Sequence, residues 1–292
     1  PFIISIVMVM MADTFFGWAD SPATMAVKIS VFLTVLWWAV FSIPILKNVR
    51  QQYYVQSPPG ELVKSTVANI WKTFRHILAD KAMLFFMLAY FFYIDGVNSV
   101  IHMATAYGST LGLDSTGMII ALLVTQLVAV PFAIWFSKLA GRVGSINMIS
   151  VAIAVYFVIC VVGFVMGFGV EEGFLTIDQA LIMFFTLAVL VGTCQGGIQA
   201  LSRSFFGKLI PPDRSNEFFG FYDIFGKFAA FMGPALYAVI ASATGRSSLG
   251  ILSIIILFAA GGGFILGGRE TLRIAEKRAV DNADKARIEN EN

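Results

Sequence analysis

The sequence has 292 residues, of which 58% are hydrophobic and only 13% charged, and its mean hydropathy is +0.81. A soluble domain carries roughly a quarter charged residues, so this composition excludes an ordinary soluble protein. The apolar residues form long unbroken runs, which predict an all-α polytopic membrane protein. The net charge of +2 does not favour a nucleic-acid partner. With two histidines, and with Cys160 and Cys194 inside apolar runs, we expect no metal site, disulfide or cofactor.

The N-terminal region contains two apolar runs. Phe2–Met11 is shorter than the roughly 20 residues that cross a bilayer, so it predicts a partial span. We therefore expect an N-terminal part of the protein to precede this chain. Val27–Leu46 is the first run long enough for a complete span. Residues 1–46 are interpreted as the end of an N-terminal helix bundle.

A basic segment, residues 47–81, follows. Apolar residues recur within it at helical spacing, which predicts an amphipathic helix on the membrane surface with its basic face towards lipid headgroups. Residues 82–268 predict a six-helix bundle, and residues 269–292 a charged tail that begins as a short helix and frays into disorder. The six spans expected in the bundle are Ala82–Tyr107, Thr116–Phe136, Met148–Phe168, Ile177–Ala200, Phe218–Ala241 and Leu249–Gly267.

Lysine and arginine alternate between the predicted loops. The linker 47–81, the loops Lys138–Gly144 and Arg203–Arg214, and the tail are basic, whereas most of the intervening loops are acidic or neutral. By the positive-inside rule, this pattern places the linker and the C-terminus in the cytoplasm.

The span from Ala82 carries polar side chains in its middle. Asp95, Asn98, Ser99 and His102 follow helical spacing, so they share one helix face, and Tyr93 precedes them. A charged group at the centre of a bilayer costs roughly 2.5–3.5 kcal/mol on insertion scales. We interpret this face as part of a solute or proton pathway. The alternative is a structural cluster that joins helices by hydrogen bonds.

Two amides lie one helical turn apart at Gln195 and Gln199. They are candidate contacts for a zwitterionic or hydroxylated solute, and the alternative is a structural role within a tightly packed helix pair. Gly192 and Gly196 on the same helix predict close approach of another backbone.

A further candidate group is Tyr222, Asp223 and Lys227. Asp223 and Lys227 are four residues apart with the acid first, which is the favourable order for a helical ion pair. Inside a bilayer this pair is either a structural bridge or a gate whose partners exchange. Gly233-Pro234 predicts a kink further along the same span.

Three arginines mark the predicted cytoplasmic ends of the spans: Arg142, Arg203 and Arg214. They are candidate gate residues that would meet an acid or a helix C-terminus. For Arg142 the alternative is ordinary positive-inside charge.

No nucleophile–base, metal-binding or paired-carboxylate arrangement can be assembled from the sequence, so an enzyme is not expected. A non-transporting membrane receptor or scaffold is the other alternative. It would require a large soluble binding surface, whereas the predicted loops are short apart from residues 47–81.

Several stretches resemble a known family. Tyr93–Asn98, Gly196–Ser204 and the region from Pro211 to Pro234 are similar to the vacuolar amino-acid effluxers and their bacterial relatives, within the major facilitator superfamily. The Lys138–Gly144 loop resembles the signature loop of that superfamily, with Arg142 and Gly144 in place. Gly141 stands where an acid is usual, so the acid-based latch of that loop is not expected in its usual form.

The resemblance implies the C-terminal six-helix bundle of a major facilitator fold, preceded by the last one or two helices of the N-terminal bundle. It also implies a secondary active transporter that moves a small polar solute, such as an amino acid, by rocker-switch alternating access. Proton coupling through Asp95 is expected. The expected partners are membrane lipid, the solute and protons, and the expected location is a bacterial inner (plasma) membrane.

Overall fold

The computed structural model describes residues 2–49, 62–211 and 214–291. The described chain is helical and falls into two units, residues 1–57 and 58–292. Residues 50–61 of the predicted linker lie outside the described residues. Seven helices, or helix pairs, in the described chain are long and apolar enough to cross a membrane. Each complete span predicted from the sequence falls within one of them, so the prediction of an all-α polytopic membrane protein is confirmed.

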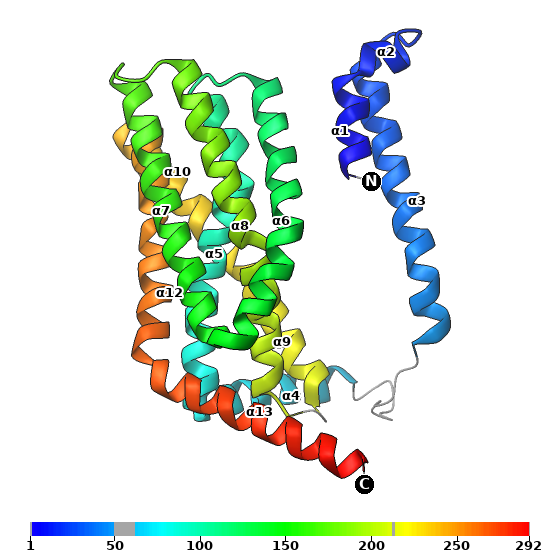
Figure 1. Cartoon of the computed structure of the whole chain (residues 1–292), viewed down its shortest axis with the longest axis vertical. Helices are drawn as coiled ribbons and strands as arrows, with labels where there is room; N and C mark the ends of the chain where they lie inside the picture. The colour runs from blue at the N-terminus through cyan, green and yellow to red at the C-terminus, as the bar shows by residue number, and fades with distance from the viewer. Residues whose placement is uncertain (1, 50–61, 212–213, 292) are drawn as a thin grey trace. The chain divides into compact units, whose positions relative to one another are not determined.

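The first unit is a short helical hairpin. Helices α1 (Phe2–Met10) and α2 (Ala12–Phe16) pack against the long helix α3 (Pro22–Asn48) (Figure 1). Most side chains of α3 are exposed, as expected for an apolar helix whose surroundings are lipid or other protein.

The second unit is a bundle of long helices. Its helices are α4 (Leu62–Ala79), α5 (Lys81–Thr110), α6 (Ser115–Val143), α7 (Ser145–Glu171), α8 (Ile177–Leu209), α9 (Ser215–Ala229), α10 (Met232–Thr244), α11 (Ser247–Ser253), α12 (Ile255–Gly267) and α13 (Arg269–Glu291). Figure 1 shows α5 to α8 and α12 running along the bundle, while α4 and α13 lie at one end of it.

Polar residues set where several of these helices begin. The Asp80 carboxylate accepts a hydrogen bond from the Met83 N–H and thereby caps α5, and Asp114 caps α6 in the same way through the Gly117 N–H. Thr176 begins α8 with a reciprocal cap. Such caps satisfy backbone donors that a helix cannot satisfy itself. Between α6 and α7 the chain reverses at Gly144, whose φ of +95° is readily adopted only by glycine.

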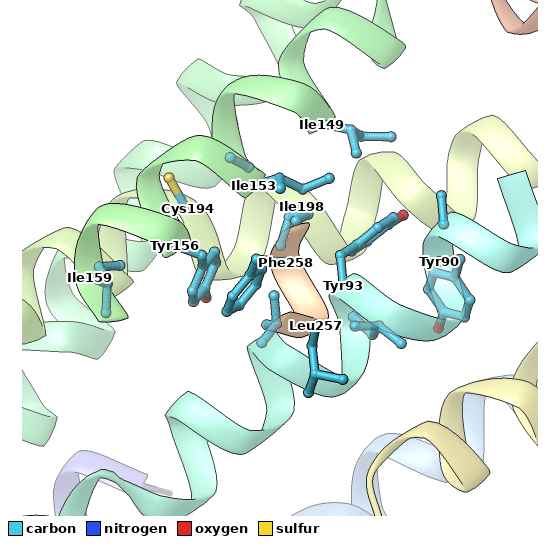
Figure 2. Close-up of a cluster of buried hydrophobic side chains, with 14 of the residues drawn as sticks. Tyr90, Tyr93, Ile149, Ile153, Tyr156, Ile159, Cys194, Ile198, Leu257 and Phe258 are labelled. Atoms are coloured by element: carbon cyan, nitrogen blue, oxygen red, sulfur yellow. The ribbon is translucent and has the colours of Figure 1, made fainter. Parts of the chain in front are cut away.

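The helices pack through small residues and a shared aromatic core. The predicted Gly192–Gly196 face meets α6, because a Cβ at Gly192 would lie 2.8 Å from the Thr125 carbonyl oxygen. Within the core, Tyr156 of α7 stacks on Phe258 of α12, with ring centroids 5.4 Å apart. Figure 2 shows these two rings and Tyr93 among buried aliphatic side chains.

Helices α4 and α13, at one end of the bundle, make packing contacts that the sequence did not predict. The amphipathic helix α4 buries Thr73 and Ile77 and packs on α5 and α9, while Trp71 stays largely exposed. The tail, for which the sequence predicts a short helix that frays into disorder, is one long helix in the described residues. It forms α13, which buries Leu272 and packs on α5, α7 and α8. This helix is longer than predicted because contacts with the bundle stabilise it, and neither charge content nor apolar content reveals those contacts.

Candidate functional site

A polar groove lies on one side of the bundle, between α5, α8 and α9. Its volume is about 460 Å³, which falls within the range of ligand sites in proteins. Half of the residues predicted for the solute pathway line this groove, although they come from three separate helices. We call this the polar groove; its lining residues are Tyr90, Ile94, Asn98, Gln199, Arg203, Tyr222, Asp223, Gly226 and Lys227.

The charges of the groove are paired differently from the sequence expectation. Asp223 accepts a hydrogen bond from Arg203 at 3.2 Å, and both side chains are more than half exposed. The predicted Asp223–Lys227 ion pair is absent from the described chain. The guanidinium of Arg203 reaches across from α8 and also lies over the Phe219 ring at 4.9 Å, and this interhelical contact replaces the local one.

Lys227 is consequently left without an ion pair in the described part of the chain. It is exposed and lines the groove. The groove therefore holds two cations, Arg203 and Lys227, and one carboxylate, Asp223. It presents an excess of positive charge beside a negative group.

Aromatic rings form one wall of the groove. Tyr90 and Tyr222 stack with ring centroids 4.1 Å apart, and Tyr222 also stacks on Phe206 at 4.8 Å. Both tyrosines are nearly fully buried, so they hold α5, α8 and α9 together as well as lining the groove. The groove therefore combines an aromatic wall with polar and charged side chains.

The structure separates the helix face of Asp95 into two parts. Asn98 lines the polar groove, whereas Asp95 and Ser99 are fully buried against the start of α10. His102 is exposed and belongs to neither group. Tyr93 is fully buried and its hydroxyl lies 2.7 Å from the Ser202 hydroxyl. Because Ser202 donates to the Ile198 carbonyl, Tyr93 is the donor in this contact.

Asp95 caps a break in a membrane span. The predicted span Phe218–Ala241 is interrupted between α9 and α10, where Pro234 cannot donate a backbone hydrogen bond. The Gly233 N–H, at the start of α10, donates instead to Asp95 Oδ1 at 3.1 Å. The interruption, at residues 230–231, lies directly before Gly233-Pro234, where the sequence predicts a kink, and the start of α10 is capped by a carboxylate from α5.

The second carboxylate oxygen of Asp95, Oδ2, is buried and has no hydrogen-bond partner within the described residues. Ser99 donates to the Asp95 backbone carbonyl at 2.7 Å and lies 3.4 Å from Oδ1, so it does not serve Oδ2. A buried carboxylate oxygen without a donor is costly, and a proton on Oδ2 would remove that charge.

The two amides of α8 point to different places. Gln199 is exposed in the polar groove. Gln195 borders a separate apolar cavity of about 100 Å³ inside the bundle, between α5, α6, α7 and α8, and its buried Oε1 has no partner in the described chain. Sequence spacing predicts that both amides lie on one helix face, but it cannot show that the neighbouring helices place them in two different cavities.

The three predicted gate arginines have three different environments. Arg203 is in the polar groove. Arg214 contacts Glu217 at 2.7 Å and Thr73 at 3.2 Å, and it thereby joins α9 to α4. Arg142 is exposed at the turn between α6 and α7 and forms no ion pair in the described chain.

An acid does reach the α6–α7 turn, although Gly141 occupies its usual place. Glu276 of α13 accepts a hydrogen bond from the Ser145 N–H at 2.7 Å, and its Oε1 lies 3.8 Å from Lys208 Nζ. It thus caps α7, which has no cap from its own residues. The sequence analysis missed this residue because it lies 131 positions from its partner in the chain.

Comparison with known proteins identifies relatives. The family described as "Vacuole effluxer Atg22 like" matches residues 2–268. An uncharacterized MFS-type transporter, YxiO, from Bacillus subtilis is 45% identical over 261 residues, which cover 89% of this chain and 58% of the relative. Autophagy-related protein 22-2 from Aspergillus clavatus is 29% identical over 82% of this chain and 42% of its own length.

The chain spans about half the length of the curated relatives that it matches. No solved structure matches it. The family resemblance drawn from Tyr93–Asn98 and the later stretches is confirmed by the match over residues 2–268. This chain therefore belongs to the vacuole effluxer Atg22-like family and is a multi-pass membrane protein.

Proposed function

We propose that this chain forms part of a secondary active transporter of the major facilitator type, which moves a small polar solute across the membrane by alternating access. Family membership and the 45% identity to an MFS-type transporter support this proposal. On this proposal, residues 1–46 belong to the N-terminal bundle, 47–81 to a cytoplasmic linker, 82–268 to the C-terminal bundle and 269–292 to a cytoplasmic tail. A bacterial inner (plasma) membrane is the proposed location.

The polar groove is the observation that carries this proposal. It combines Lys227, a cation with no ion pair among the described residues, the ion pair Arg203–Asp223 and the amide of Gln199 in one space of about 460 Å³. A zwitterion such as an amino acid offers a carboxylate to the cations and an ammonium to Asp223. Amino acids and related metabolites are accordingly the proposed substrates. Asn98 and the hydroxyl of Tyr222 would complete the polar contacts.

Asp95 is the proposed proton-coupling group. It is fully buried, its Oδ2 has no partner in the described chain, and its Oδ1 holds the broken end of α10. Protonation of Asp95 would remove the negative charge that faces this helix end, and the break would then be freer to move. Ser99 packs directly against the same backbone, so the start of α10 is the element through which Asp95 would act.

The arginines are proposed gate contacts. Arg203 can exchange Asp223 for a substrate carboxylate, because the pair is exposed and such pairs contribute little stability. Arg214 ties α9 to α4 through Thr73 and Glu217, so movement of α9 must break or carry this link. For Arg142 the gate role has no contact in the described chain to support it.

The test is solute flux in proteoliposomes that contain the purified protein. Radiolabelled amino-acid uptake should be inhibited by other amino acids, but not by their methyl esters or by the matching acids without an amino group. Inhibition by methyl esters as strong as by amino acids would contradict carboxylate recognition in the groove. Saturable binding without any flux would instead favour a receptor.

A further inference from the structure

A second charged pocket lies away from the polar groove, where α6 turns into α7 and α13 crosses the end of the bundle. Its volume is about 580 Å³. Four cationic side chains line it: Arg142, Lys208, Arg273 and Lys277. We call this the basic pocket. The remaining lining residues are Ala140, Gly141, Val143, Gly144, Asn147, Ile274, Glu276, Val280 and Asp281.

The positive charge of the basic pocket is only partly neutralised. Four cations face two carboxylates, Glu276 and Asp281. Glu276 is already engaged, because its Oε1 accepts the Ser145 N–H and lies 3.8 Å from Lys208 Nζ. In the part of the chain that the structure describes, neither Arg142 nor Lys277 forms an ion pair. The pocket can therefore accept an anion.

Apolar side chains also line the pocket. Val143, Ile274 and Val280 line it, and each is between 45% and 51% exposed. A small soluble anion gains nothing from such side chains. An amphiphile gains from both features, because its anionic group meets the cations while its hydrocarbon covers the apolar side chains.

The pocket lies at the end of candidate membrane spans, where lipid headgroups are expected. It is formed at the ends of two membrane spans, α6 and α7, and α13 begins directly after the last span ends at Gly267. Figure 1 shows α13 running across the end of the bundle instead of continuing along it. Basic pockets at this level of a membrane protein are suited to anionic lipid phosphates.

We propose that the basic pocket binds the phosphate of an anionic phospholipid, with Arg142, Arg273 and Lys277 as its cationic contacts. Val143, Ile274 and Val280 contact the glycerol and the first acyl carbons. Because Arg142 belongs to α6 while Arg273 and Lys277 belong to α13, the bound lipid links α13 to the bundle. This proposal does not depend on which solute is transported.

Native mass spectrometry of the purified protein in a neutral detergent tests the proposal. Phosphatidylglycerol is titrated against the parent protein, against Arg142→Gln/Lys277→Gln and against Lys138→Gln. Lys138 is an exposed cation near the same end of α6 that does not line the pocket, so it controls for charge loss. Each basic residue near an anionic lipid contributes about fivefold in binding, so the double variant should bind about 30-fold more weakly. The Lys138 variant should bind like the parent.

Further measurements test whether binding is weakened by the loss of charge and not by misfolding, and whether the ligand is a lipid or a soluble anion. Arg142→Lys/Lys277→Arg keeps both charges and should retain binding, which shows that the pocket tolerates substitution. Phosphatidylcholine and inorganic phosphate should not compete with phosphatidylglycerol. Unchanged lipid affinity in the charge-removed variant overturns the proposal, and so does equal competition by inorganic phosphate, which would identify a soluble-anion site.

Discussion

The carboxylate of Asp95 on α5 accepts a hydrogen bond from the backbone N–H of Gly233 at the start of α10, at 3.1 Å. The two residues are 138 positions apart in the chain. One buried acid therefore has two tasks in the proposed mechanism, since it holds the end of a broken span and carries the proton that would release that end. Substitutions at these two positions can separate the two tasks.

Asp95→Asn and Asp95→Ala should differ in stability. Asparagine keeps an Oδ1 that can accept the Gly233 N–H, whereas alanine leaves that buried donor unpaired. An unpaired buried donor costs about 1–3 kcal/mol, so Asp95→Ala should lower the apparent Tm by several degrees relative to Asp95→Asn. Thermal unfolding in detergent measures the difference. Equal Tm values for the two variants would show that the Gly233 contact contributes nothing to stability.

Gly233→Ala should destabilise the bundle. A Cβ at this position would overlap both the Oγ and the Cβ of Ser99, and it would lie 3.2 Å from Asp95 Oδ1. Overpacking of this kind costs about 1–3 kcal/mol. The matched control is Gly262→Ala on α12, where the nearest atom would be 3.5 Å away and the Tm should be unchanged.

A second substitution tests whether the overlap with Ser99 causes the loss of stability in Gly233→Ala. Ser99→Gly removes the side chain that the new methyl group would meet, so Gly233→Ala/Ser99→Gly should recover part of the lost Tm. A double variant that is no more stable than Gly233→Ala would show that the cost arises elsewhere.

Lys227→Gln should weaken solute binding without unfolding the protein. Lys227 is exposed and makes no ion pair in the described chain, so its removal should leave the Tm unchanged. A charge-assisted contact with a substrate carboxylate contributes about 1.5–3 kcal/mol, which corresponds to a change in affinity of about 10- to 160-fold. Lys227→Arg should keep most of the affinity. The affinity is measured as the concentration of unlabelled substrate that inhibits uptake of labelled substrate by half. An affinity in Lys227→Gln equal to that of the parent would show that Lys227 does not contact the solute.

Glu276→Ala should release α13 from the end of the bundle. Glu276 caps α7 through Ser145 and approaches Lys208, and alanine removes both contacts. Hydrogen exchange in residues 269–282 should become faster, whereas Glu270→Ala, an exposed acid on the same helix, should leave it unchanged. Exchange that stays at the parent rate in Glu276→Ala would mean that Leu272 and its neighbours hold α13 without the acid.

The sequence was sufficient to locate the spans, because about 20 consecutive apolar residues have few structural alternatives. It also predicted most of the polar groove, since Asn98, Gln199, Arg203, Tyr222, Asp223 and Lys227 were candidates before their distances were known. Polar residues inside apolar runs are rare enough to be recognised individually. Their placement in one groove is a property of the packed bundle.

Partners on other helices could not be predicted. Helical spacing suggested Lys227 for Asp223, but the observed partner, Arg203, comes from a different helix. The contacts Asp95–Gly233 and Glu276–Ser145 join residues more than 130 positions apart, and one member of each contact is a backbone N–H that has no sequence signature. Local periodicity describes one helix at a time, so it carries no information on such pairs.

Solute movement driven by an imposed pH gradient, measured in proteoliposomes of the Asp95→Asn variant, tests the central claim most directly. Asparagine keeps the cap on α10 but cannot exchange a proton at this position. The account predicts that gradient-driven movement falls to the rate seen without a gradient, while exchange of labelled for unlabelled solute continues because the polar groove is intact. Gradient-driven movement at the parent rate would contradict proton coupling through Asp95.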